Sequence, residues 1–277
     1  MKLSFTKMQG TGNDFVVLNA YSRSLNLSVD QYRFLANRHY GIGCDQILVV
    51  EKAQHRDIDF RYRIFNADGS EVEQCGNGAR CFAKYVYKKG LTNKKDIRVE
   101  TNSGVIVLHI TDDEKIVVDM GSPNFIPELI PLNVEHQSPV YEVTLEESKI
   151  QFSCLSLGNP HAVVLVDDIS AEEVDRIGLI MGKSSLFPNG VNVGFMQVLD
   201  SKHLLLRVFE RGVGETLACG TGACAAVVAG INMSLLDNHV EVKLSGGSLL
   251  IDWDGQDSSV RLAGDAKFVF EGEIDIN

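Results

Sequence analysis

Two cysteines carry the most reactive chemistry in this chain, and each opens the same short phrase, Cys-Gly-x-Gly-Ala. Cys75 begins the first phrase at residues 75–79, and Cys219 begins the second at residues 219–223. A thiol followed by a glycine-rich turn and a helix-forming run is typical of a helix N-terminus, where free backbone N–H groups stabilise anions and lower the pKa of a cysteine. Two such thiols on opposite sides of one carbon would remove one proton and return another, which inverts a stereocentre.

Proton transfer from carbon asks more of a thiol than a helix N-terminus provides. The reference pKa of a thiol is about 8.5, and making a thiol mostly ionised at pH 7 takes about 2.7 kcal/mol. A helix N-terminus contributes ~0.3–1 kcal/mol, and up to ~2 kcal/mol in partly buried sites. We therefore expect a neighbouring base or cation to assist. Because two thiolates would repel each other, we also expect the pair to share one ionisable proton.

The two cysteine phrases belong to an internal repeat. Cys75 and Cys219 lie 144 positions apart, and other short phrases recur at nearly the same offset. The recurring positions are Gly12-Asn13 with Gly158-Asn159, Glu71 with Glu215, Gly104 with Gly247, and Gly121 with Gly264. A period this long indicates two similar domains and not a solenoid array. The expected halves are residues 1–121 and 122–263, and the sequence leaves open whether the C-terminal strand 264–277 joins the first half.

Short β-branched runs bounded by turn residues predict a strand-rich α+β fold with few helices. Helices are expected after the cysteine phrases, at 77–89 and 221–236, and after the capping-box sequences Ser28-x-x-Gln31 and Ser170-x-x-Glu173. The segment 221–231 is almost wholly apolar, which is typical of a helix buried on all sides. We therefore predict two pseudo-symmetric β-rich domains, each wrapped around a central apolar helix. The expected strands include 99–101, 105–110, 116–119, 240–244, 249–253 and 260–262.

The composition is that of an ordinary water-soluble protein and argues against several function classes. Hydrophobic residues make up 44% of the chain, but the sequence contains no run of eighteen or more apolar residues, the length that a membrane-spanning helix needs. The net charge of −11 argues against nucleic acid, whose phosphates repel an acidic surface. The first residues lead into no apolar signal core, so we expect a cytoplasmic protein. Without a Cys-x-x-Cys pair we expect no zinc site, and a large soluble chain without a signal needs no disulfide framework. Four cysteines should be small core residues: Cys44, Cys81, Cys154 and Cys224.

Eight phrases rich in glycine, asparagine and cysteine lie in order along the chain, at 10–16, 41–46, 66–70, 75–81, 158–161, 192–193, 209–212 and 218–224. Together they resemble the diaminopimelate epimerases. The resemblance implies an amino-acid epimerase without cofactor or metal, which interconverts LL- and meso-2,6-diaminopimelate, a precursor of lysine and peptidoglycan. It also implies an active site in the cleft between the two domains. Members of this family are usually dimers with an aromatic residue near the C-terminus in the contact, so we expect a homodimer with Phe270 at that position.

The resemblance also implies roles for individual residues. Cys75 and Cys219 would exchange the roles of base and acid with the direction of the reaction, and His161 and Glu210 would assist them as catalytic groups. The α-carboxylate would lie on backbone N–H groups at the two helix starts, which are Gly76, Asn77, Gly220 and Thr221. Arg211 would bind the distal carboxylate, and the other expected substrate-binding residues are Asn13, Gln46, Asn66, Asn159, Asn192 and Glu210.

Plain structural roles remain open for four of these residues. The alternatives are a satisfied loop histidine for His161, a surface carboxylate paired with Arg211 for Glu210, and turn-capping amides for Asn66 and Asn192. Arg80 is equally compatible with a solvated side chain one turn into its helix, and neither Arg80 nor Cys44 is given a role.

Two rival functions also remain. A proline or hydroxyproline racemase would use two such cysteines in a duplicated fold, although the phrases around Asn13, Asn66 and Arg211 favour a substrate with a second polar head. A thiol redox protein, whose two cysteines cycle through a disulfide, leaves the glycine–asparagine phrases and the repeat unexplained.

Overall fold

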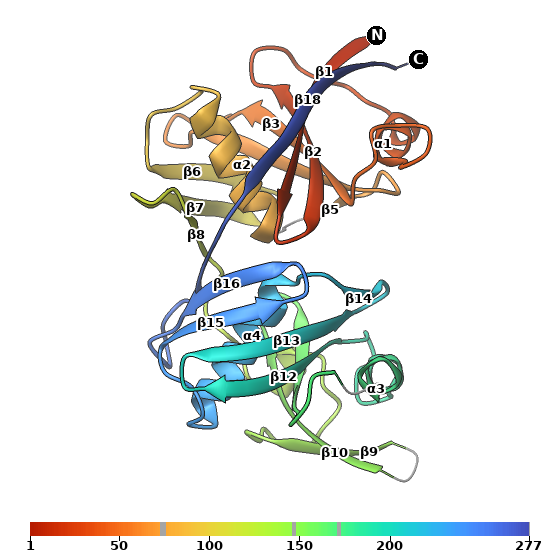
Figure 1. Cartoon of the computed structure of the whole chain (residues 1–277), viewed down its shortest axis with the longest axis vertical. Helices are drawn as coiled ribbons and strands as arrows, with labels where there is room; N and C mark the ends of the chain where they lie inside the picture. The colour runs from red at the N-terminus through yellow and green to blue at the C-terminus, as the bar shows by residue number, and fades with distance from the viewer. Residues whose placement is uncertain (73–75, 146–147, 171–172, 277) are drawn as a thin grey trace. The chain divides into compact units, whose positions relative to one another are not determined.

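The computed structural model describes residues 1–72, 76–145, 148–170 and 173–276, and Cys75 therefore lies outside the described residues. The chain forms two compact units (Figure 1). Unit 1 contains Met1–Asp119 and Ala263–Asn277, and unit 2 contains Met120–Leu262.

Unit 1 is built on a mixed sheet around the helix α2. Strand β1 pairs antiparallel with both β18 and β2, β2 runs parallel to β3, and β3 pairs antiparallel with β4. Strand β4 then pairs antiparallel with β5 and parallel with β6, from which β7 and β8 continue as antiparallel neighbours. The elements are β1 (Lys2–Gly10), β2 (Asn13–Ala20), α1 (Val29–Ala36), β3 (Gln46–Lys52), β4 (Phe60–Asn66), β5 (Glu71–Val72), α2 (Gly76–Lys88), β6 (Asp96–Thr101), β7 (Gly104–Ile110), β8 (Ile116–Asp119) and β18 (Lys267–Asp275).

Unit 2 repeats this arrangement around the helix α4. Strand β10 pairs antiparallel with β9 and β11, β11 runs parallel to β12, and β12 pairs antiparallel with β13. Strand β13 pairs antiparallel with β14 and parallel with β15, and β15 pairs antiparallel with β16. The elements are η1 (Pro127–Leu129), β9 (Tyr141–Leu145), β10 (Ser148–Ser156), β11 (Pro160–Leu165), α3 (Glu173–Gly182), β12 (Asn192–Asp200), β13 (His203–Glu210), β14 (Gly214–Thr216), α4 (Gly220–Asn232), β15 (His239–Leu244) and β16 (Gly247–Asp252), while β17 (Arg261–Gly264) crosses the unit boundary. The predicted pseudo-symmetric α+β fold is confirmed.

The repeat extends to individual side chains. In unit 1 the guanidinium of Arg63 donates to both carboxylate oxygens of Glu71, each at 2.8 Å. In unit 2 Arg207 donates to Glu215 in the same bidentate way, at 2.6 and 2.7 Å. Each pair joins neighbouring strands, β4 with β5 and β13 with β14, so the two halves share side-chain contacts as well as strand order.

The helices α2 and α4 pack against the strands of their own units. Helix α4 contacts β10, β11, β12, β13, β15 and β16, and its residues from Gly222 to Gly230 are buried throughout. Helix α2 contacts β1, β2, β3, β7 and β8, but it also carries Arg80, which is fully buried. The guanidinium of Arg80 donates to Thr11 Oγ1 at 2.6 Å and to the Asp265 carbonyl at 3.3 Å, so the solvated alternative for Arg80 is wrong.

The second glycine of each cysteine phrase lets its helix approach a neighbouring strand. A Cβ added to Gly78 would lie 2.3 Å from the Tyr62 hydroxyl of β4. A Cβ on Gly222 would lie 3.1 Å from Val208 of β13 and 3.2 Å from the Cβ of Cys219. Close packing therefore explains why the phrase Cys-Gly-x-Gly keeps a residue without a side chain at this position.

Several expected element boundaries can be compared with the structure. The capping box of Ser28 is present, since Ser28 Oγ accepts from Gln31 N–H and Gln31 Oε1 accepts from Ser28 N–H. The capping box of Ser170 depends on residues 171–172, which lie outside the described residues. Helix α4 ends at Asn232 instead of residue 236, because the chain turns through Ser234 with φ of 59°. The C-terminal strand β18 pairs with β1 and so belongs to unit 1.

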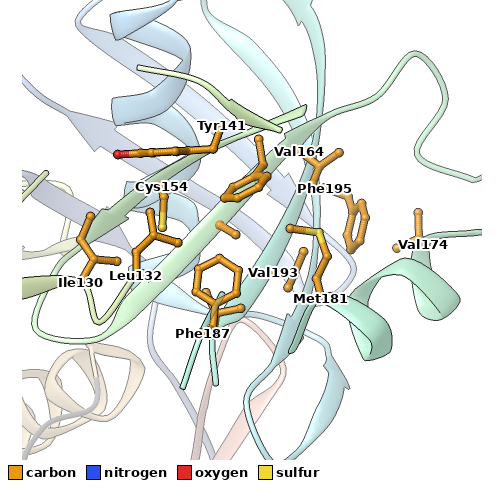
Figure 2. Packing of buried hydrophobic residues seen from close by; sticks show 13 residues of the cluster. Ile130, Leu132, Tyr141, Cys154, Val164, Val174, Met181, Phe187, Val193 and Phe195 are labelled. Atoms are coloured by element: carbon orange, nitrogen blue, oxygen red, sulfur yellow. The ribbon is translucent and has the colours of Figure 1, made fainter. Parts of the chain in front are cut away.

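Each unit has an apolar core on the face of its sheet that the short helices α1 and α3 cover. Figure 2 shows the unit 2 cluster, in which Met181 of α3 lies beside Phe195 and Val193 of β12. Cys154 belongs to this cluster and Cys44 to the corresponding cluster of unit 1. Cys81 and Cys224 are fully buried as well, which confirms the four predicted core cysteines. In the part of the chain that is described, no helix is both long and apolar enough to span a membrane.

Candidate active site

Cys219 lies at the start of α4 in unit 2, where the sequence placed it. It is the N-cap residue, with φ of −124° and ψ of 114°, and its side chain is 5% exposed. Its carbonyl accepts the first helical hydrogen bond, from Ala223 N–H at 2.9 Å. Its Sγ lies 3.5 Å from Thr221 Oγ1, inside the first turn of the helix. The thiol is therefore held at the positive end of the helix.

The pKa of the Cys219 thiol is nevertheless raised far above its ordinary value. Burial is the largest cause, and the negative charge of Glu210, which also shares a hydrogen bond with the thiol, raises the pKa further. The Thr221 hydroxyl and the Gly222 N–H lower it by less. The expected lowering of the pKa is thus outweighed, because desolvation of a thiolate costs more than one helix N-terminus returns. In this state Cys219 is a protonated thiol.

His161 is the most buried ionisable side chain of this group, at 1% exposed. It lies on β11 opposite Asn192 of the parallel neighbour β12. Its Nε2 is 3.0 Å from Asn159 Oδ1, so Nε2 carries the proton in this contact. Burial, followed by the charge of Arg211, lowers the pKa of His161 to about 3. The imidazole is therefore neutral at physiological pH, with Nδ1 as its basic nitrogen.

Asn159 and Thr221 connect the imidazole to the thiol. Asn159 receives the His161 N–H on its amide oxygen and donates through Nδ2 to Thr221 Oγ1 at 3.3 Å. The Thr221 hydroxyl in turn contacts Cys219 Sγ. Four side chains that lie up to 62 positions apart thus form one hydrogen-bonded chain ending at the sulfur.

Glu210 and Arg211 follow each other at the end of β13 but face different partners. Glu210 Oε1 accepts from Thr216 Oγ1 at 2.5 Å, and the carboxylate also contacts the Cys219 thiol. Arg211 N–H donates to Asn192 Oδ1 at 2.9 Å, and its Nη1 donates to the Asn189 carbonyl at 3.0 Å. Among the ion pairs of the described residues, none joins Glu210 to Arg211, so the alternative of a surface pair is not supported.

Thr216 is the contact that sequence reasoning missed. Thr216 lies on β14, opposite Val208 of β13. The equivalent residue of unit 1 is Val72 of β5, which lies opposite Ile64 of β4. Because the repeat offers an apolar residue there, the comparison of halves gave no signal for a hydrogen-bond donor to Glu210.

Four predicted binding residues of unit 1 form two hydrogen-bonded pairs, one of which includes Asn77 in the first turn of α2. Asn77 Nδ2 lies 3.4 Å from Asn13 Oδ1 and donates to it, while Gln46 Nε2 donates to Asn66 Oδ1 at 2.9 Å. Asn66 Nδ2 donates to Ser70 Oγ at 3.3 Å, so part of its capacity is used in the turn after β4. Gly76 is the first residue of α2, and Cys75 lies outside the described residues.

The register of the two sheets shows which residues replace one another. Phe15 lies opposite Gln46 in unit 1 where His161 lies opposite Asn192 in unit 2. Asn66, at the end of β4, corresponds to Glu210 at the end of β13. Unit 2 therefore carries the ionisable groups, and unit 1 carries an aromatic and an amide in their places. Among the described residues, no three His, Cys, Asp or Glu side chains converge as a metal site.

A solved protein structure shares this duplicated α+β fold. A probable proline racemase from Agrobacterium radiobacter K84 superposes with a TM-score of 0.72 at 13% identity, covering 99% of this chain and 93% of that one. At this identity the likeness shows the fold alone.

Sequence comparisons are more specific. The profile of the family described as diaminopimelate epimerase matches residues 5–126 and 153–269. Proteins named diaminopimelate epimerase from Nitrosospira multiformis and Teredinibacter turnerae are 52% identical over 276 residues and 53% identical over 274 residues. The alignments cover 100% and 99% of this chain, respectively, and 99% of each relative. This chain belongs to the diaminopimelate epimerase family, and the resemblance noted in its sequence is confirmed.

Proposed function

We propose that this protein interconverts LL- and meso-2,6-diaminopimelate by moving a proton at the α-carbon between two thiols, without a cofactor. The observation that carries the proposal is the Cys219 thiol at the start of α4, in contact with Glu210 and Thr221. Family membership over the full length of the chain supports diaminopimelate as the substrate, in preference to proline. The product meso-diaminopimelate serves the supply of lysine and peptidoglycan.

In the first direction Cys219 acts as the acid. The Cys75 thiolate takes the α-proton on one side of the carbon, and the Cys219 thiol returns a proton on the other side. The protonated state of Cys219 that burial favours is the form this direction needs. Charge that spreads into the α-carboxylate is stabilised by backbone N–H groups at the helix starts, which are Gly76, Asn77, Gly220 and Thr221.

In the reverse direction the shared proton must first pass from Cys219 to Cys75, so that Cys219 is the thiolate base and Cys75 is the thiol acid. Glu210 shares a hydrogen bond with the thiol and is the group placed to draw that proton away. The Thr221 hydroxyl, whose oxygen accepts from Asn159, is free to direct its own O–H to the thiolate sulfur as charge develops. His161 holds Asn159 in the orientation that makes this possible. Glu210 and His161 thus act on Cys219 in different ways.

The remaining predicted residues bind the far end of the substrate. Arg211 presents its guanidinium from an exposed turn, with its backbone fixed by Asn192, and matches the two oxygens of a carboxylate. The amides of unit 1 and unit 2 would orient the distal carboxylate and ammonium without adding net charge; they are Asn13, Gln46, Asn66, Asn159 and Asn192.

We propose a cytoplasmic homodimer. The reducing cytoplasm preserves the free thiols that the reaction requires. Strand β18 exposes three successive apolar residues, Phe268, Val269 and Phe270, and a second copy of the chain would cover them. Phe270 packs edge to face on Phe5, with ring centroids 5.9 Å apart, so it is held in place for such a contact.

Solvent exchange tests the reaction itself. LL-diaminopimelate incubated with the enzyme in D2O should gain deuterium at the α-carbon while meso-diaminopimelate accumulates, with no net oxidation. Cys75→Ala and Cys219→Ala should each abolish epimerisation. Full activity in either variant, or exchange at the α-carbon of proline in place of diaminopimelate, would refute the proposal.

A further inference from the structure

A charged network in unit 1 adjoins two proposed binding residues, Asn13 and Gln46. It consists of Lys7, Asp14, Arg38 and Asp45; Asp14 follows Asn13, and Asp45 precedes Gln46. The two aspartates bind each other's backbone, since Asp45 Oδ2 accepts from Asp14 N–H at 3.1 Å and Asp14 Oδ1 accepts from Asp45 N–H at 2.9 Å.

Two cations hold these carboxylates. Arg38 donates to Asp14 Oδ1 and Oδ2 at 2.7 and 3.0 Å and to Asp45 Oδ1 at 2.8 Å. Lys7 Nζ lies 2.6 Å from Asp14 Oδ2. Partial burial would raise the pKa of Asp14, but the bonds from Arg38 and Lys7 outweigh it and hold that pKa well below its usual range. The Asp14 carboxylate therefore remains charged throughout the working range of pH.

The network fixes the direction of the Asn13 amide. Asp45 Oδ2 lies 2.8 Å from Asn13 Nδ2, and a carboxylate only accepts hydrogen bonds. The NH2 group of Asn13 must therefore face Asp45, and its oxygen faces Asn77 Nδ2. Asn77 is consequently turned with its NH2 group toward Asn13. Its own Oδ1 is buried, and the described residues supply no donor for it.

The two halves orient their equivalent asparagines by different means. In unit 2 the amide oxygen of Asn159 is fixed by His161, two residues further along β11. In unit 1 the residue two positions after Asn13 is Phe15, which has no donor. In unit 1 Asp45 fixes the Asn13 amide instead, by accepting a hydrogen bond from its NH2 group. The residue before Asn192, the unit 2 counterpart of Gln46, is Val191, which carries no charge, so the arrangement is particular to unit 1.

We propose that Asp45 is a positioning residue for the substrate. By fixing both amides in one direction, it presents the Asn77 carbonyl oxygen at the start of α2 as a buried acceptor for a ligand ammonium group. A buried acceptor without a donor is unfavourable, and a bound ammonium removes that cost. The inference rests on the proposed function, since diaminopimelate supplies the ammonium.

Asp45→Asn separates this role from a structural one, because asparagine keeps the shape of aspartate but can turn either an oxygen or an NH2 group toward Asn13. Asp59→Asn is the matched control. Asp59 also lies in unit 1 and accepts from a backbone N–H, that of Arg98 at 2.9 Å, and from a lysine, Lys94 Nζ at 2.5 Å. None of its partners is a proposed ligand residue.

The measurements are KM and kcat for LL-diaminopimelate and the inhibition constant of pimelate, the same dicarboxylic acid without amino groups. Losing one hydrogen bond to a charged donor should raise the KM of Asp45→Asn roughly tenfold. Both kcat and pimelate inhibition should change far less, because the contact forms equally in the ground and transition states and pimelate does not make it. The Asp59→Asn control should leave KM and pimelate inhibition within about twofold.

Asn77→Ala removes the acceptor directly and decides the matter alone if Asp45→Asn does not fold. It should lose the same preference for diaminopimelate over pimelate, and the double variant should lose no more than either single one. Equal weakening of both ligands, a fall in kcat alone, or an unchanged KM would overturn the proposal. A wild-type enzyme that does not bind diaminopimelate would refute the proposed function, and this inference with it.

Discussion

Replacing Glu210 with glutamine should make the Cys219 thiol easier to ionise and nevertheless slow turnover. Glutamine keeps an oxygen at the position of Oε1, so the bond from Thr216 survives and folding should change by less than about 1 kcal/mol. What disappears is the negative charge beside the thiol. That charge raises the pKa of Cys219, so the thiol of the variant should ionise at lower pH. Burial, the larger cause, is unchanged, and the pKa therefore stays above that of an ordinary cysteine.

Turnover should nevertheless fall, because the proton of Cys219 loses its acceptor. General acid–base assistance is worth about 10²–10⁴-fold in rate, and a fall in this range is expected when Cys219 must act as base. The assays are epimerisation from each diastereomer and peptide-resolved alkylation of Cys219 by iodoacetamide across pH. Faster alkylation together with slower turnover would support the role given to Glu210. Turnover near that of the wild type, or alkylation that slows along with turnover, would refute it.

Three further outcomes follow from the structure. The pKa of His161 is about 3 in the folded protein and 6.5 in the unfolded chain, so the unfolded chain binds an extra proton between these pH values. The free energy of unfolding should therefore fall by about 1.4 kcal/mol for each pH unit below pH 6.5. His161→Gln should flatten this dependence when it is measured by urea unfolding. Gly222→Ala should lower the free energy of unfolding by about 1–3 kcal/mol, because the new Cβ meets Val208. It should also displace Cys219, whose Cβ it meets. Urea unfolding measures the first effect, and alkylation of Cys219 measures the second. Phe270→Asp should yield monomers by sedimentation velocity while the fold persists by circular dichroism.

The repeat and its helices could be predicted because their signals are local. The cysteine phrases place a helix start after a tight turn, and Gly78 and Gly222 mark the points where those helices approach a strand. The capping box of Ser28 is likewise contained in four residues. Helix α4 ends four residues earlier than the sequence predicts, because apolar residues recur as far as Leu236 while the backbone has already turned at Ser234.

The electrostatics of the site could not be predicted in the same way. The sign of the pKa shift at Cys219 depends on how completely other elements cover the thiol, and burial is a property of the whole unit. The contact between Asp14 and Asp45 joins residues 31 positions apart that meet only because β2 and β3 pair in parallel. Nothing in either phrase indicates that its carboxylate would bind the backbone of the other.

The divergence of the two halves has a consequence for the reaction. Duplication supplies two helix starts of the same design, but only unit 2 has an ionisable group at the positions of His161 and Glu210; unit 1 has Phe15 and Asn66 there. The carboxylate of Glu210 favours the protonated thiol at Cys219, whereas an amide at Asn66 exerts no such charge. If the pair shares one ionisable proton, that proton rests on Cys219, and the thiolate belongs to Cys75. Under the proposed mechanism, this state would accept the diastereomer whose α-proton Cys75 removes, and the opposite diastereomer would require the proton to leave Cys219 first. Glu210→Gln should consequently lower kcat unequally in the two directions, while the ratio of the two kcat/KM values stays equal to the equilibrium constant.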